Sequence, residues 1–188
     1  YEEGMDIDIV GFSRGAAMAN ELARRLADKN MTVRFLGMFD PVYSKGVAGQ
    51  SSSNVYQTPG GFNGNYVTTS IPDNVVTAAT IYAEHERRSW FPYTQFTHSK
   101  QQTRHIAMKM TGQHGEIGGH WQNNRLTGSV TLAAMAQMME DAGVVGLNRT
   151  ARQDRNIAAA LQSNYLNARG VGGYDETHGN WGREDFLD

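Results

Sequence analysis

The sequence predicts an α/β fold with a mostly parallel sheet, and three observations lead to this prediction. Short apolar runs typical of buried strands alternate along the chain with longer segments of helical periodicity. A glycine-flanked pentapeptide, residues 11–15, joins the first such strand to the first helix. The second strand ends in the pair Asp40-Pro41. We expect right-handed crossovers between the strands and a single domain over residues 1–188.

The first part of the chain supplies two strands and one helix. Residues 6–10 alternate isoleucine with aspartate and end in valine, as in a strand that enters a core. In the helix that follows, Met18, Leu22 and Leu26 lie four apart on one face, with small alanines near its start. Residues 33–39 form a second apolar run, which we interpret as a buried strand.

The middle of the chain is harder to interpret. Residues 43–66 are rich in Gly, Ser, Asn and Gln, which predicts a long loop or insertion of the kind that often serves as a lid or binding element. Residues 74–83 fit a strand or a helix equally well. Residues 103–110 alternate weakly and predict a third strand, which leads into the turn-rich segment 112–119.

The last part of the chain is predicted to be helical and then loose. Residues 129–142 have the pattern of a good helix, and residues 151–166 that of a second, more exposed one. The Gly- and acid-rich tail, 170–188, follows. We therefore expect a catalytic core over about 1–145, with a helix and a loose tail over 146–188.

The composition excludes several classes of protein. Lys and Arg number 17 and Asp and Glu 19, so the net charge of −2 gives no reason to expect a nucleic-acid partner. The absence of cysteine excludes a disulfide scaffold, a zinc finger and a thiol nucleophile. No run reaches the roughly 20 apolar residues of a membrane-spanning helix, so we expect peripheral membrane contact at most.

The pentapeptide Gly11-Phe12-Ser13-Arg14-Gly15 matches G-x-S-x-G between a predicted strand and a predicted helix. In this context the serine stands on a sharp, strained turn as a nucleophile, and both flanking positions must be small. The backbone N–H of Arg14 then lies at a helix N-terminus, where it can stabilise an oxyanion. The alternative is an ordinary strand-to-helix turn with Ser13 as the helix cap.

A serine nucleophile needs a base, and the base needs an acid that orients it. Asp40 ends the second predicted strand, where functional residues of a parallel sheet gather. The alternative for Asp40 is a turn-forming Asp-Pro pair. Asp28 and Asp73 are rival acids, but neither ends a convincing strand.

Six histidines compete for the role of base. His114 follows a predicted strand and lies among glycines, so we expect its ring on a loop that can approach the serine; the alternative is an exposed loop histidine. His120, six residues further on, is the serious rival, and His105 lies inside a strand, where a structural role is more typical. The others lack a matching context: His85, His98 and His178.

A metal site is a weaker interpretation of the same segment. His114, Glu116 and His120 supply nitrogen and oxygen ligands within seven residues, but no H-E-x-x-H or comparable spacing is present. We therefore expect no metal and no cofactor.

Four ordered motifs resemble those of a bacterial and fungal α/β-hydrolase family that contains the type VI secretion phospholipase effectors. They are Gly-Phe-Ser-Arg-Gly-Ala at 11–16, Phe-Leu-Gly-Met-Phe-Asp-Pro-Val at 35–42, Glu-Arg-Arg at 86–88 and His-Gly-Glu-Ile-Gly-Gly at 114–119. The resemblance spans residues 6 to about 142. It implies a three-layer α/β-hydrolase-like sandwich and phospholipase A-type cleavage of carboxylic esters.

The same resemblance implies Ser13 as nucleophile, Asp40 as triad acid and His114 as base. It also implies a protein made in the bacterial cytoplasm and secreted into a target cell, with an immunity or carrier protein as a partner. The family's D-T-V-G is here Asp40-Pro41-Val42-Tyr43, and its H-S-D-V-G-G is changed at three positions, which puts the shape of the substrate pocket in doubt. The family strands before the elbow, with the second oxyanion donor, are not in this chain, so we expect a sheet that is incomplete on its N-terminal side.

The arginines allow two interpretations. Arg14, Arg87 and Arg88 could hold a phosphate head group by bidentate hydrogen bonds. For Arg87 and Arg88 we favour the other interpretation, a structural ion-pair network with Glu86.

We therefore predict a serine hydrolase that cleaves carboxylic esters, with a phospholipid as the expected substrate. The alternative is a catalytically inactive hydrolase-like module that serves in binding or as a scaffold. The aromatic cluster 90–92 and the loop 43–66, with its Tyr56, Phe62 and Tyr66, fit an acyl-binding lid, and they fit ordinary core and surface aromatics equally well.

Overall fold

The computed structural model describes residues 4–42, 69–88, 91, 96–98, 103–119 and 125–147. In these residues four strands and three helices follow one another in the order β1 (Asp8–Phe12), α1 (Arg14–Ala27), β2 (Val33–Phe39), β3 (Val75–Ala83), β4 (Arg104–Met110), α3 (His114–Ile117) and α4 (Arg125–Asp141).

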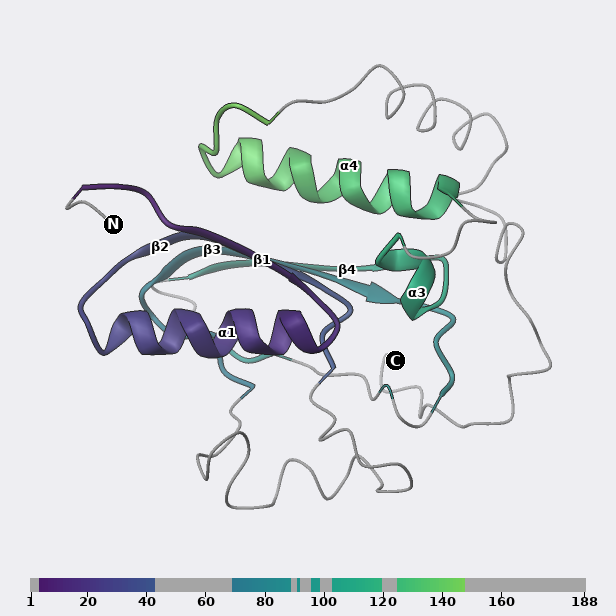
Figure 1. Ribbon diagram of the computed structural model, residues 1–188, viewed down its shortest axis with the longest axis horizontal. Helices are drawn as coiled ribbons and strands as arrows, with labels where there is room; N and C mark the ends of the chain where they lie inside the picture. The colour runs from purple at the N-terminus through teal and green to yellow at the C-terminus, as the bar shows by residue number, and fades with distance from the viewer. Residues whose placement is uncertain are drawn as a thin grey trace.

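The four strands form one parallel sheet in the order β1-β2-β3-β4. The last residues of β1 and β2, Phe12 and Phe39, are register partners, and Phe39 is opposite Ile81 near the end of β3. All four strands therefore end at the same edge of the sheet, which lies towards α3 in Figure 1. Segments that follow these carboxyl ends are brought together there.

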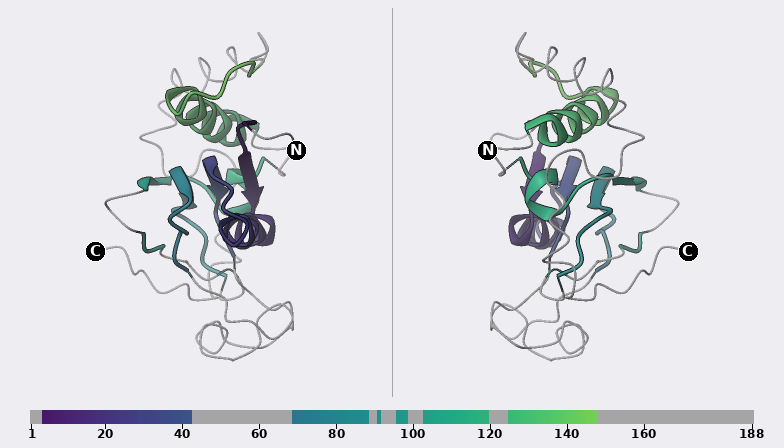
Figure 2. Two further views of the ribbon diagram at one scale, coloured as in Figure 1. Left: turned by 90° about the vertical axis from the view of Figure 1, so that its left-hand side faces the viewer. Right: turned by 90° about the vertical axis from the view of Figure 1, so that its right-hand side faces the viewer.

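Helices cover both faces of the sheet, which gives three layers. Helix α1 packs on one face and α4 on the other, as the end-on views of Figure 2 show, while α3 lies at the carboxyl edge of the sheet and contacts α4 and β3. Each interface has its own apolar core. The α1 side includes Ala16, Ala23, Leu36, Met38 and Ala78, and the α4 side includes Phe35, Ala79, Ile81, Ile117 and Met135.

Glycine in β2 allows α4 to approach the sheet closely. A Cβ atom at Gly37 would lie 2.9 Å from both the Met135 sulfur and the Phe35 ring, which is closer than real Cβ contacts. A larger residue at this position would therefore require the side chains of Met135 and Phe35 to shift.

The three-layer α/β architecture with a parallel sheet is confirmed, and the ambiguous segment 74–83 is a strand. Several boundaries differ from the predictions. The first strand runs on through Gly11 to Phe12 and α1 begins at Arg14, while α4 begins at Arg125 rather than at 129. The pattern of apolar residues does not fix where the hydrogen bonds of an element begin.

Of the expected apolar stripe of α1, Leu26 packs against the core, but Met18 and Leu22 do not lie on the buried face. Met18 is 55% exposed and Leu22 47% exposed. The buried side chains of α1 are mostly alanines, together with Asn20: Ala16, Ala17, Ala19, Asn20 and Ala23. The helix packs closely against β1 and β2 because these small residues leave little distance between helix and sheet.

Several predictions lie outside the described residues. They concern the loop 43–66, Trp90 and Pro92 of the aromatic cluster, the helix 151–166, the tail 170–188, and the histidines His120 and His178. Among the helices that the structure describes, none is both long and apolar enough to cross a membrane.

Candidate active site

The candidate site lies at the carboxyl edge of the sheet, and each of its parts directly follows a strand. Ser13 comes after β1, Asp40 after β2, the segment of Glu86 after β3, and His114 after β4. Parallel strands thus bring together residues that are as much as 101 positions apart in the sequence.

Ser13 occupies a sharp turn between β1 and α1. Its φ of 59° and ψ of −127° lie in a sparsely populated region of backbone space, which costs on the order of 1–3 kcal/mol in a non-glycine residue. The Ser13 N–H donates to the carbonyl oxygen of Phe39 at 2.9 Å, so the neighbouring strand helps to hold the turn. The Ser13 side chain makes no capping hydrogen bond, which argues against the helix-cap alternative.

Only one of the two flanking glycines is required by sterics among the described residues. A Cβ atom at Gly11 would lie 2.4 Å from the carbonyl oxygen of Gly15. A Cβ atom at Gly15 would have no described atom within 4 Å. The described residues therefore require a small side chain at Gly11 but not at Gly15, which is exposed at the start of α1.

The three residues selected from the sequence are joined by two hydrogen bonds. The Nε2 atom of His114 is 2.8 Å from Ser13 Oγ, and its Nδ1 atom is 2.7 Å from Asp40 Oδ2. An ionised carboxylate only accepts hydrogen bonds, so we assign the proton to Nδ1. The Nε2 atom is then left to accept the hydroxyl proton of Ser13.

Asp40 is fixed by the ends of two strands. Its side chain is fully buried, its Oδ1 atom accepts the N–H of Ala83 at 3.0 Å, and its own N–H donates to Ile81 at 2.7 Å. Its φ of 35° is left-handed, which is unusual for a residue with a side chain. The carboxylate has no freedom to turn away from the histidine without breaking the bond to Ala83.

Two aromatic rings pack against the imidazole of His114. The centroid of Phe12 is 4.6 Å from that of the His114 ring, and the centroid of Phe91 is 4.4 Å away. His114 is only 5% exposed. These two rings pack against the imidazole, and both of its nitrogens make hydrogen bonds, so its orientation is fixed.

His114 is the first residue of the short helix α3, so the expectation of a loop is corrected. Gln113 caps this helix, and Glu116 closes a capping box by accepting the Gln113 N–H at 2.7 Å. The turn-rich composition of the segment hid the helix because four residues are too few to show a helical period.

The metal interpretation is not supported by the part of the chain that the structure describes. No group of three or more His, Asp or Glu side chains in that part is arranged to hold an ion. The buried carboxylate of Glu116 caps a helix, and both ring nitrogens of His114 have partners. The third candidate ligand, His120, lies outside the described residues.

The backbone N–H of Arg14 is placed as a candidate oxyanion donor. Arg14 is the first residue of α1, and the first N–H groups of a helix have no acceptor within the helix. The Arg14 side chain is exposed beside Ser13.

Glu86 is the residue of this site whose role the sequence did not reveal. Its buried carboxylate accepts hydrogen bonds from Arg88 at Nε and Nη2, 2.8 and 2.6 Å long, which matches the expected ion pair. The same carboxylate also accepts the backbone N–H of His114 at 3.2 Å. The Arg87 side chain is exposed. The sequence signal was the Glu-Arg-Arg motif, but nothing in the motif indicated which element it would contact.

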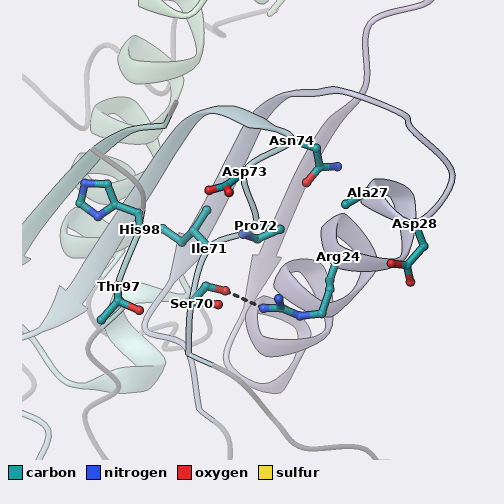
Figure 3. A pocket seen from close by; sticks show the side chains of 10 residues that line it. All are labelled: Arg24, Ala27, Asp28, Ser70, Ile71, Pro72, Asp73, Asn74, Thr97 and His98. Carbon is teal, nitrogen blue, oxygen red and sulfur yellow. Dashed lines mark hydrogen bonds between the residues drawn. The ribbon is translucent and has the colours of Figure 1, made fainter. Parts of the chain in front are cut away.

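The rival acids lie at the opposite end of the sheet. Asp28 follows α1 and Asp73 precedes β3, and both line a cavity of about 480 Å³. Figure 3 shows this cavity with Arg24 donating from Nη2 to the carbonyl oxygen of Ser70 at 2.6 Å. The cavity is formed at the amino ends of the strands, and Ser13 does not line it. Neither rival acid is therefore placed to orient a base at Ser13.

His105 is a structural histidine, as expected from its position in a strand. Its Nε2 atom is 3.0 Å from Thr80 Oγ1, and the ring of His98 meets it edge-on at 5.1 Å. Burial, and secondarily the nearby His98, lower the pKa of His105 to about 4. His105 is therefore neutral at physiological pH and has a hydrogen-bonding role in the sheet.

Two solved structures are similar to this chain, and the first of them shares its fold. A Pseudomonas aeruginosa protein, whose crystal structure is described only as that of an uncharacterized protein, is 19% identical over 93% of this chain, with a TM-score of 0.61. A Tle1 effector bound to the VgrG spike of the type 6 secretion system is 23% identical over 59% of this chain, with a TM-score of 0.42. This chain covers 30% and 24% of those two chains.

No curated protein matches the sequence. Residues 19–141 match the family described as "T6SS, Phospholipase effector Tle1-like, catalytic domain". The matched segment includes Asp40 and His114 and begins six residues after Ser13. Because it covers well over half of the sequence, the chain belongs to the family of Tle1-like phospholipase effectors of the type VI secretion system, through their catalytic domain.

Proposed function

We propose that this chain carries the catalytic centre of a serine hydrolase that cleaves carboxylic esters of phospholipids. Ser13 is the nucleophile, His114 the general base and acid, and Asp40 the acid that orients the histidine. The observation that carries the proposal is the continuous set of hydrogen bonds from Ser13 Oγ through the imidazole to Asp40 Oδ2. The strained backbone at Ser13 supports it, because strain of this kind gathers at catalytic turns.

The geometry supports a two-step acyl transfer. His114 Nε2 takes the hydroxyl proton as Ser13 Oγ attacks the ester carbonyl, and the Arg14 N–H donates to the developing oxyanion. The imidazolium then returns its proton to the leaving alcohol, which yields an acyl-serine. A water molecule loses a proton to His114 and attacks this acyl group, and the fatty acid leaves while Ser13 regains its proton.

Asp40 contributes by fixing the tautomer of His114 and by stabilising the positive charge that its imidazole acquires. Its carboxylate accepts from Nδ1, which keeps Nε2 free to take a proton and stabilises the imidazolium that forms. No cofactor is needed for any of these steps.

Family membership supports the substrate class and the delivery route. Phospholipid is the substrate that the family description names, and secretion into a target cell follows from its assignment to the type VI secretion system. We include in the proposal a carrier or immunity protein as a partner, and only peripheral contact with the membrane that holds the substrate.

The first test is covalent labelling with a fluorophosphonate probe, which reacts with activated serines. We expect the wild-type protein to be labelled, the Ser13→Ala variant to lose labelling completely, and the His114→Ala variant to keep only a slow residual rate. The controls are Ser70→Ala and His98→Ala, which line the cavity at the amino ends of the strands and should label like the wild type. Release of fatty acid from phosphatidylethanolamine–phosphatidylglycerol vesicles, lost in Ser13→Ala, then tests the substrate.

The outcomes separate the two functions that the sequence left open. A folded wild-type protein that is not labelled would refute the proposal and favour the inactive binding module. Labelling at Ser13 without release of fatty acid from any vesicle would keep the serine hydrolase and reject phospholipid as its substrate.

A further inference from the structure

We propose that Glu86 is a positioning residue for His114, and that it acts from two directions, on the backbone directly and on the ring through Arg88 and Phe91. The inference rests on the proposed function, because it takes His114 as the base. It assigns a role to the Glu-Arg-Arg segment that goes beyond an ion pair between neighbours.

The first direction is a hydrogen bond to the backbone of His114. As the first residue of α3, His114 has an N–H that no carbonyl of the helix can accept. Glu86 Oε2 accepts it at 3.2 Å, within a buried environment. This bond fixes the point from which the imidazole extends towards Ser13.

Glu86 also acts on the face of the His114 imidazole, through the side chains of Arg88 and Phe91. Arg88 binds the Glu86 carboxylate in a bidentate arrangement, and its guanidinium lies 4.0 Å from the ring centroid of Phe91. Phe91 in turn packs on the His114 imidazole. The carboxylate therefore holds the arginine, the arginine covers the phenylalanine, and the phenylalanine limits rotation of the imidazole.

Burial makes this arrangement more than a surface ion pair. The Glu86 side chain is 1% exposed, and its oxygens also accept the backbone N–H of Arg88 at 2.8 Å. An ionised carboxylate that is removed from water needs such a set of donors. One of its donors belongs to α3, so the carboxylate joins the segment after β3 to the helix that carries the base.

The inference predicts a graded loss of reactivity. The Glu86→Gln side chain keeps an oxygen that can accept from the His114 N–H, but it loses the charge that holds Arg88. Glu86→Ala loses both contacts. We expect the rate of fluorophosphonate labelling to fall about tenfold in Glu86→Gln and about a hundredfold in Glu86→Ala, because small displacements of a catalytic group have effects of this size.

A double-mutant comparison separates positioning from a general loss of structure. In a His114→Ala background the residual reactivity of Ser13 should not fall further when Glu86 is changed, because Glu86 acts through the histidine. Glu84→Gln is the matched control: it is an exposed carboxylate two residues away that bonds the Thr111 hydroxyl, and it should leave labelling unchanged. Melting temperatures are measured for all variants, and Arg88→Met replaces Glu86→Ala if the latter does not fold.

A measurement independent of activity completes the test. The proton on His114 Nδ1, assigned by its loss in His114→Ala, is followed by nuclear magnetic resonance, together with hydrogen exchange at the His114 amide. We expect Glu86→Ala to broaden the ring-proton signal and to speed exchange at that amide, whereas Glu84→Gln changes neither.

Unchanged labelling and unchanged resonances in Glu86→Ala would overturn the inference. So would a further fall of the residual labelling rate when Glu86→Ala is added to His114→Ala, or a loss of labelling that follows the melting temperature alone. If the wild-type protein is not labelled at all, the proposed function fails, and the resonance and exchange measurements still decide whether Glu86 holds His114 in place.

Discussion

Ser13 and Asp40 are held at a fixed separation by backbone hydrogen bonds that bracket the aspartate. The Ser13 N–H donates to the carbonyl oxygen of Phe39, just before Asp40, and the Ser13 carbonyl oxygen accepts the N–H of Val42, just after it, at 3.1 Å. The turn after β1 and the end of β2 therefore form one unit. His114 completes this unit from the opposite side, by contacts with both side chains.

Replacing Asp40 with asparagine should remove most of the reactivity and leave the fold intact. The amide can still accept from Ala83, but its NH₂ group would face Nδ1 and favour the tautomer with the proton on Nε2, which cannot take a proton from Ser13. We expect the labelling rate to fall about 10³- to 10⁴-fold. Asp28→Asn and Asp73→Asn are the matched controls at the far end of the sheet. Labelling of Asp40→Asn at the wild-type rate would show that Asp40 does not orient the base.

The two glycines of the pentapeptide should respond in opposite ways to alanine. Gly11→Ala places a Cβ atom 2.4 Å from the Gly15 carbonyl oxygen, and we expect it to lower the free energy of unfolding by about 1–3 kcal/mol. The Cβ atom of Gly15→Ala meets no described atom within 4 Å and lies in a helix, so we expect a gain of about 0.5–1 kcal/mol. Urea unfolding of the three proteins measures both values. Equal losses in the two variants would contradict the steric argument.

An alanine at position 118 should affect reactivity through the Phe12 ring. The new Cβ atom would lie 2.4–2.7 Å from three carbons of that ring, which cannot retreat freely because its neighbour is the His114 imidazole. We expect Gly118→Ala to lose about 1–3 kcal/mol of stability and to label more slowly at a temperature where it is fully folded. Gly15→Ala is again the control. A Gly118→Ala protein that loses stability but labels at the wild-type rate would show that the ring of Phe12 does not constrain the base.

The positions of Ser13, Asp40 and His114 could be predicted because each follows an apolar run. Parallel strands of similar length end together, so residues that follow them gather at one edge whatever the connections between them. The positions of the motifs along the chain then favoured His114 among the six histidines as the base, and Asp40 among the aspartates as the acid that orients it. The main uncertainty at that stage, the strand or helix at 74–83, did not affect this result.

The partners of these residues could not be predicted in the same way. Two contacts, that of Glu86 with His114 and that of Phe12 with Gly118, depend on the directions in which two turns leave the sheet. The pattern of apolar and polar residues does not indicate those directions. The buried face of α1 was misjudged for a related reason. Met18 and Leu22 are the larger side chains, but close packing on the sheet favours alanine, and size alone does not show which face is inside.

The free energy of unfolding should depend on pH through the protonation of His105. Its pKa is lowered to about 4 by burial and by His98, against about 6.5 in an unfolded chain, so protons bind the unfolded state first. The contribution of His105 to the free energy of unfolding is therefore fully present above about pH 6.5 and is lost as the pH falls towards 4. A shift of this size corresponds to about 3–4 kcal/mol at most, and partial exposure of the ring reduces our expectation to about 1–2 kcal/mol.

The measurement is the free energy of unfolding between pH 4 and pH 7 for the wild-type protein and for His105→Gln, whose amide can still pair with the Thr80 hydroxyl. The difference between the two proteins removes the contribution of all other titrating groups. We expect the wild-type protein to lose stability relative to the variant over this range, with a smaller difference in a His98→Gln background, because one cause of the pKa shift is then absent. Parallel curves would mean that His105 binds protons equally well in the folded and unfolded states, and that solvent reaches its ring.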